Sequence, residues 1–229
     1  MGTAASPALS GMGVGRNTNA FVANTVDQEP YLYWDAGCLT AVAGAQLFGT
    51  YFAFSIPIGQ PNPALPTVGG NNQTQTKLQT NMQTGNQFPP PRCLLLNAIC
   101  FQYASNMLKA DIDAIENGAY FEFKIADKIF YEGYLRDCPA GAGLQGVSTN
   151  NGESVYTNGW ATPAGRRTFG SWSKYIPPLT RFSLNIIFNG SNNIVGGNAT
   201  PPTMTASGSG GTGMNFRIVL DGITALPVQ

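Results

Sequence analysis

Hydrophobic and polar residues alternate with a period of two in several separate stretches of the chain. Residues 120–125 read YFEFKI, so that every second position is aromatic or aliphatic and the intervening positions are mostly charged. Residues 180–188 and 214–221 repeat this alternation with phenylalanine, leucine and isoleucine. Successive side chains of a β-strand point to opposite faces, so each stretch predicts a strand with one face in a core.

The region from residue 88 to residue 135 contains the strongest strand signals and the only convincing helix. Residues 93–103 (CLLLNAICFQY) form an apolar run too short to span a membrane, which indicates a strand buried on both faces. Ser105 is placed to cap a helix over residues 106–117, which Gly118 ends. The strands at 120–125 and 129–135 are joined by a tight link and predict a hairpin.

Residues 38–58 are largely apolar and long enough to be considered as a transmembrane segment. Glycine, glutamine and proline within this stretch, and alternation over residues 51–56, favour a buried strand instead. With further strands at 31–34, 153–157 and 167–176, the total is about eight to ten strands, most of them separated by long loops. This pattern is typical of an all-β, two-sheet antiparallel sandwich with one short helix, rather than an up-and-down barrel.

Three polar segments lack the apolar residues that a core of their own would require. Residues 1–28 are predicted to be a flexible N-terminal arm, and residues 29–229 a single domain. Residues 71–87 (NNQTQTKLQTNMQTGNQ) are either a mobile loop or an extended segment that adds to a neighbouring subunit's sheet. Residues 189–213 form a second low-complexity loop. We expect all three segments to become ordered at subunit boundaries, with residues 71–87 the best suited to cross.

The composition is poor in charge. Only 10% of the 229 residues are charged, against about 25% in an average soluble domain. The 12 basic and 12 acidic residues balance, so no overall field attracts nucleic acid or an anionic membrane. A neutral polar surface is typical of proteins that lie against other protein surfaces. A secreted β-protein with a bland surface is the alternative that composition alone allows.

The sequence offers no catalytic constellation. It has no histidine, which removes Ser–His and Cys–His nucleophile systems and the commonest general base. Asp111 and Asp113 would face different directions on a helix, and Asp137 lies in a turn where it would cap its own backbone. The glycine-rich runs lack a phosphate-loop lysine, and Arg166-Arg167 is the only basic doublet. We therefore expect no enzyme and no catalytic, cofactor-binding or metal-binding residues.

The four cysteines, Cys38, Cys93, Cys100 and Cys138, show no C-x-x-C spacing. Seven positions separate Cys93 from Cys100, which would put them far apart and on opposite faces of an extended strand. We expect all four to be reduced and mostly buried, as suits assembly inside a cell. No signal peptide is visible at the N-terminus.

From residue 80 to residue 146 the order of features is distinctive. A proline-rich turn leads into a long apolar strand (TNMQTGNQFPPPRCLLLNAICFQY), followed by the predicted helix, the hairpin and a Gly/Pro loop (PAGAGLQG). With weaker support from residues 180–188 and 214–220, this order resembles the single jelly-roll coat proteins of icosahedral viruses, and especially the capsid or accessory capsid proteins of bacteriophages, including those with an internal membrane. The resemblance implies an eight-stranded jelly roll, symmetric self-assembly and no catalytic residues.

The resemblance also implies a location and partners. The chain is expected to be a structural virion protein, a capsid or capsid-decorating subunit assembled in the host cytoplasm. Its expected partners are copies of itself and other virion proteins, and peripheral contact with an internal viral membrane is left open. Coat proteins that touch the genome often have a basic arm, whereas residues 1–28 carry only Arg16 as a basic residue, so contact with nucleic acid is not expected.

Two other functions share the composition. A phage tail or fibre component is one of them. A carbohydrate-binding sandwich is the other, with Trp160, Trp172 and Tyr175 stacking on sugar rings. Exposure of those three rings on one flat face would favour carbohydrate binding, and their burial would favour the coat protein.

Overall fold

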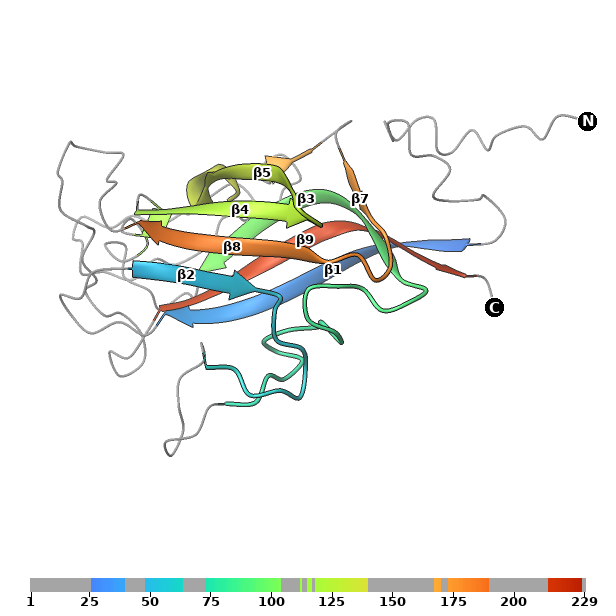
Figure 1. Ribbon diagram of the computed structural model, residues 1–229, viewed down its shortest axis with the longest axis horizontal. Coiled ribbons are helices and arrows are strands. Elements are labelled where there is room, and N and C mark those ends of the chain that lie inside the picture. Colours follow the sequence, from blue (N-terminus) through green and yellow to red (C-terminus); the bar gives the residue numbers. More distant parts are fainter. Residues whose placement is uncertain are drawn as a thin grey trace, which may run out of the picture.

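The computed structural model describes residues 26–39, 48–63, 73–103, 112, 115–116, 118–139, 167–169, 173–189 and 214–227. These residues form two antiparallel β-sheets that lie face to face (Figure 1). The elements are β1 (Val26–Leu39), β2 (Phe48–Ala53), β3 (Cys93–Tyr103), β4 (Ala119–Ile125), β5 (Lys128–Tyr134), a 3₁₀ turn η2 (Leu135–Asp137), β6 (Arg167–Thr168), β7 (Lys174–Ile176), β8 (Phe182–Asn189) and β9 (Met214–Pro227).

The strand order is that of a jelly roll. One sheet has five strands in the order β1-β9-β3-β6, with β7 also paired to β3, and the other has four in the order β2-β8-β4-β5. Strands pair around the β4–β5 hairpin as if the chain were folded in half, so that β1 meets β9, β2 meets β8, and β3 meets β6 and β7. Rolling this ribbon adds the β3–β9 and β4–β8 pairs. The predicted all-β jelly-roll sandwich is confirmed.

Phenylalanine rings fill the space between the sheets. The alternation predicted for β4 is confirmed, with every second residue buried. Phe88 and Phe182 stack with their ring centres 5.0 Å apart, and Phe101 meets Phe121 edge-on at 5.1 Å. Burial of each such side chain contributes about 1.5–3 kcal/mol, so these rings supply much of the driving force for the sandwich. The fully buried phenylalanines are Phe54, Phe88, Phe101, Phe121, Phe123 and Phe182.

Strand β3 is buried on both faces, as predicted, but its alternation is broken. The register against β9 shifts at Asn97, which is therefore an extra residue in a β-bulge. Cys93 pairs with Ala225 and Cys100 with Val219, and those two partners lie an even number of positions apart on β9. Both cysteines consequently lie on the outer face of the five-stranded sheet. The prediction of opposite faces was wrong because it assumed an unbroken strand.

The apolar stretch at residues 38–58 is not one strand. It contains the end of β1 and the whole of β2, while residues 40–47 lie outside the described part of the chain. Phe54 has a φ of 59°, which ends β2 and turns its ring into the core. No helix among the described residues is long and apolar enough to cross a membrane.

Other predicted boundaries shift. The strand expected at 31–34 is part of the longer β1, which begins inside the predicted arm, and residues 1–25 lie outside the description. Residues 167–176 hold two short strands instead of one. Of the predicted helix, Ile112, Ile115 and Glu116 are described and have helical backbone, with both isoleucines in the core; Gly118, expected to end it, is helical too. The strand expected at 153–157 and residues 190–213 are not described.

Close approach of two strands explains a glycine in β9. A Cβ atom on Gly222 would lie 2.3 Å from the carbonyl oxygen of Leu95, beside the bulge in β3. We expect Gly222→Ala to lower the free energy of unfolding by about 3 kcal/mol, because the backbones must separate. Gly59→Ala is the control, since Gly59 has a φ of 85° and nothing within 4 Å, and its cost should be only about 1 kcal/mol. Urea unfolding of both variants checks this, and equal losses would contradict it.

Candidate functional site

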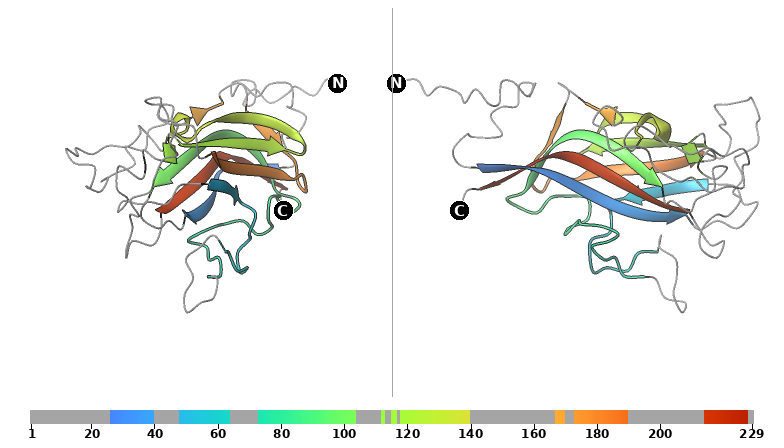
Figure 2. Two further views of the ribbon diagram at one scale, coloured as in Figure 1. Left: turned by 60° about the vertical axis from the view of Figure 1, so that its left-hand side comes forward. Right: turned by 180° about the vertical axis from the view of Figure 1, so that it is seen from behind.

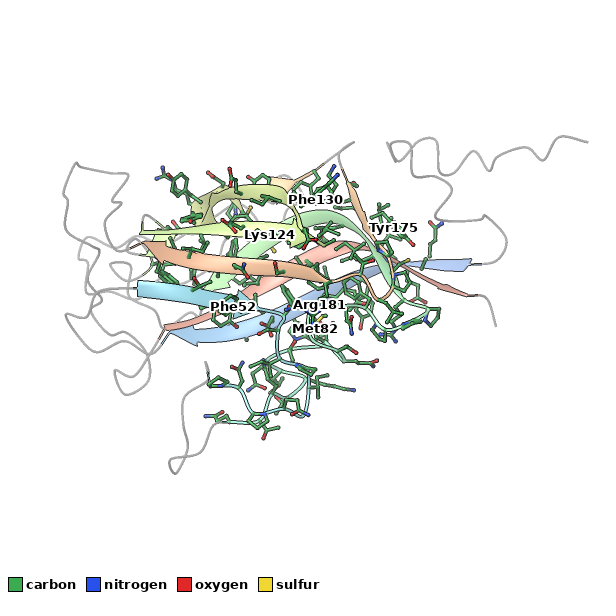
Figure 3. The ribbon with its side chains drawn as sticks, in the orientation of Figure 1. Phe52, Met82, Lys124, Phe130, Tyr175 and Arg181 are labelled. Atoms are coloured by element: carbon green, nitrogen blue, oxygen red, sulfur yellow. The ribbon has the colours of Figure 1, made fainter. Side chains whose placement is uncertain are left out.

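After β2 the chain leaves the sandwich and folds back on itself. We call residues 54–63 and 73–87 the excursion; it lies below the sandwich in every view (Figures 1 and 2). Its two halves pair at Pro61 and Thr74, and the amide of Asn62 donates to the carbonyl of Gln73 at 2.8 Å. The side chain of Met82 anchors the excursion in the main core (Figure 3).

The excursion closes the outer edge of β1. The amide of Ala36 donates to the carbonyl of Gln79 at 2.6 Å. The side chain of Asn81 acts like the peptide group of a neighbouring strand: its Oδ1 accepts the Trp34 amide at 2.9 Å, and its Nδ2 donates to the Leu32 carbonyl at 2.8 Å. The described residues 73–87 are therefore hydrogen-bonded to their own chain, rather than forming a free loop. This part of the β1 edge cannot accept a further strand.

A buried carboxylate holds the excursion to both sheets. Asp35 of β1 is 2% exposed and points inward. It accepts hydrogen bonds from the Phe54 amide at 2.8 Å, the Tyr51 hydroxyl at 3.2 Å and Gln75 Nε2 at 3.4 Å. Desolvation by burial raises the pKa of Asp35 from 3.8 to about 6, although the bond from Phe54 and the side-chain donors oppose the shift. One side chain thus joins β1, the end of β2 and the excursion.

The excursion presents a leucine on a rigid turn. The Gln79 amide donates to the Thr76 carbonyl at 3.0 Å, and Gln79 Oε1 accepts the Thr76 amide at 2.8 Å. Trp34 Nε1 ties the turn to β1 by donating to the carbonyl of Lys77 at 3.1 Å. Leu78, at the top of this turn, is 86% exposed. We call Lys77 and Leu78 the knob.

A hollow lies on the outer face of the four-stranded sheet. Tyr120 of β4 is directly opposite Tyr134 of β5, and both point away from the core. Together with Glu132 and Gly133 they line a cavity of about 310 Å³, which we call the tyrosine pocket. Tyr134 is 39% exposed and Glu132 is exposed. Two aromatic walls and a carboxylate suit this pocket to an apolar group carrying a positive charge or a hydroxyl.

The sugar-stacking residues suggested by the sequence are not brought together in the described structure. Trp160 and Trp172 lie outside the described residues. Tyr175 lies on β7, half-buried against Cys93 and Leu95 in a small cluster on the outer face of the five-stranded sheet. Desolvation raises the pKa of Tyr175 to about 12, with further contributions from the Cys93 thiol.

The remaining predicted features have ordinary structural roles or are not described. Asp137 Oδ2 accepts the amide of Tyr134 at 3.2 Å, so it caps local backbone as predicted. Asp111, Asp113 and Arg166 lie outside the described residues, as do the side chains of Arg167 and Cys38. The other three cysteines are buried thiols. Within the described part of the chain, no three histidine, cysteine, aspartate or glutamate residues gather into a metal site.

Sequence reasoning missed both Asp35 and the tyrosine pocket. The sequence signal for a buried Asp35 was its position: it is a single acidic residue that follows aromatic strand residues (YLYWDAG) and precedes a long stretch without charged residues. The signal for the pocket was the hairpin register, which puts Tyr120 opposite Tyr134. No family model, curated protein or solved structure matches this chain.

The raised pKa of Asp35 makes stability depend on pH. Because the folded protein binds this proton more tightly than the unfolded chain, the stabilisation is complete below pH 3.8 and is lost as the pH rises through about 6. The loss amounts to about 3 kcal/mol. We expect Asp35→Asn to remove this part of the pH dependence, because the asparagine side chain does not ionise. Gln75 Oε1, which has no partner among the described residues, is an acceptor for the new amide.

Urea unfolding between pH 4 and pH 7 measures the difference. Asp127→Asn, in the exposed β4–β5 turn, is the control and should keep the slope of the unmodified protein. A slope that is the same in Asp35→Asn and in the unmodified protein would contradict the assignment.

Proposed function

We propose that this chain is a structural virion protein, a self-assembling capsid or capsid-decorating subunit without catalytic activity. The observation that carries the proposal is the jelly-roll pairing, in which each strand meets its counterpart around the β4–β5 hairpin. Viral capsid proteins, lectins and cupins are among the protein classes that use this arrangement. The fold alone does not select among them, so the choice depends on the site.

The core favours a building block over an enclosed binding site. Cupin-type chemistry requires polar ligands inside the roll, whereas here the space between the sheets is packed with phenylalanine and leucine. The sequence also contains no histidine to serve as such a ligand. Asp35 faces inward, but its carboxylate is engaged by Phe54, Tyr51 and Gln75.

The surface favours contact with other protein. A charge content of 10% leaves few groups that must stay hydrated, and exposed apolar side chains such as Phe52 and Leu78 project from ordered elements. The balance of 12 basic and 12 acidic residues argues against a partner held by phosphate charge. The proposed partners are copies of this chain and other virion proteins.

Carbohydrate binding is the second candidate. The specific observation in its favour is the tyrosine pocket, where two rings and Glu132 could contact the face and hydroxyls of a sugar. Under this alternative the chain is a lectin-like or receptor-binding module of a phage tail or fibre.

Electron microscopy and mass photometry of the purified full-length chain test the first candidate. We expect closed particles or rings whose yield rises with protein concentration, because assembly is a mass-action process. Two results together would contradict the coat function and favour the lectin function. They are a protein that stays monomeric at all concentrations and salt conditions, and binding of that protein on a glycan array.

Hydrogen exchange on assembled and dissociated protein gives a second readout. Residues 73–87 should already be protected in the dissociated chain, because they bond to β1. Residues 1–25 and 190–213 should gain protection only on assembly, where ordering against a neighbour offsets about 1–2 kcal/mol of backbone entropy per residue. Equal exchange of these two segments in both states would remove them from the subunit boundary.

A further inference from the structure

We infer that the tyrosine pocket of one copy receives the knob of a second copy, with Leu78 between the two tyrosines and Lys77 beside Glu132. This inference rests on the proposed self-assembly and specifies one contact through which it occurs. Four properties of the described residues carry it: the rigidity of the knob, the shape and chemistry of the pocket, their charges, and their positions on the molecule.

The knob is held in place before it meets a partner. The turn around Leu78 is closed by the bonds between Thr76 and Gln79, and it is tied to β1 through Trp34 Nε1 and the Lys77 carbonyl. An apolar side chain that is 86% exposed on ordered backbone loses little backbone freedom when it is covered. Burying it in a neighbour's pocket also removes apolar surface from water, worth about 25 cal/mol per Å².

The pocket is built on the β4–β5 hairpin and is open to solvent. Its volume of about 310 Å³ exceeds the needs of one leucine side chain, so the stem of a lysine can enter with it. Tyrosine is enriched at protein interfaces because its ring offers a large contact area with few rotatable bonds. Gly133, between Glu132 and Tyr134, also lines the pocket.

The charges match. Lys77 is the residue next to Leu78, and Glu132 lines the pocket; both are exposed, and neither forms an ion pair with a described residue. In contrast, Glu122 on the same face is already paired with Lys124. In a protein with few charges, one unpaired cation on the knob and one unpaired anion in the pocket favour a single docking register.

The two surfaces cannot meet within one molecule. The excursion lies below the sandwich, whereas β5 runs along its upper side, in each of the views (Figures 1 and 2). A knob and a pocket on opposite sides make a heterologous, head-to-tail contact. Such a contact repeats from copy to copy and closes into a ring when the rotation between neighbours permits it. The same geometry therefore provides a route to a symmetric assembly.

A charge exchange tests the contact directly. We expect Lys77→Glu and Glu132→Lys each to reduce the assembled fraction about tenfold at a fixed protein concentration, and the double variant to recover to within about threefold of the unmodified protein. Leu78→Ser should reduce assembly at least as strongly as either single charge variant. Leu179→Ser is the matched control, because Leu179 is 61% exposed but belongs to neither the knob nor the pocket. Mass photometry gives the assembled fraction, and urea unfolding of each variant verifies the fold.

Cross-linking between different copies gives an independent readout. Protein carrying only Leu78→Cys, mixed with protein carrying only Tyr134→Cys under mild oxidation by diamide, should give covalent dimers. A mixture of protein carrying Leu179→Cys with protein carrying Tyr134→Cys is the control and should give no covalent dimers.

If the unmodified chain assembles, three results would overturn the inference. The first is assembly by both single charge variants at the level of the unmodified protein, and the second is failure of the double variant to recover. The third is a Tyr134→Ala variant that loses glycan binding but assembles as the unmodified protein does. This result would show that the tyrosine pocket binds a sugar instead of the knob. If the unmodified chain does not assemble at all, the proposed function fails and this contact fails with it. Assembly that ignores all knob and pocket changes leaves the proposed function intact and rejects only the contact.

Discussion

Burial of the Asp35 carboxylate is the constraint on which the rest of the first half of the molecule depends. A carboxylate that is 2% exposed must be surrounded by donors, and no single strand can supply them. The Phe54 amide becomes available only because the chain turns at a φ of 59° after β2, and Gln75 only because the excursion folds back. The two carboxylate oxygens of Asp35 need hydrogen-bond donors. This need therefore determines where the chain leaves β2, how the excursion folds back and how the edge of β1 is closed.

Protection of sheet edges is a second constraint on the structure. An open strand edge pairs readily with any other chain, so folded proteins block it. Here the side-chain amide of Asn81 covers part of the β1 edge. At its other side, the five-stranded sheet ends in the short strands β6 and β7. In β5 the register shift opposite Phe123 leaves Phe130 as a bulged residue, with the Lys174 ammonium 4.7 Å from its ring centre. Where these edges are covered, their backbone is not open to pairing with a further strand.

The sequence was sufficient for the elements whose burial follows a simple period. The strands β4, β8 and β9 carry large apolar residues at alternate positions, and β3 is apolar except for Asn97 and Gln102, so their existence could be predicted. The bulge at Asn97 could not, because an asparagine inside an apolar run has no distinct pattern. The role of residues 73–87 was also hidden, since Asn and Gln that bond to a strand edge look the same in sequence as those of a loop. Asp35 and the tyrosine pocket depend on contacts across 40 positions of chain or between strands.

The same carboxylate links the stability of the fold to the presentation of the knob. Lys77 and Leu78 lie only two and three residues beyond Gln75, whose side chain contacts Asp35, and their turn is tied to Trp34 next to Asp35 in β1. Because the pKa of Asp35 is raised to about 6 by desolvation, its ionised form carries a free-energy cost at neutral pH. The donors from Phe54, Tyr51 and Gln75 limit that cost, and two of them, Phe54 and Gln75, belong to the excursion that carries the exposed Leu78.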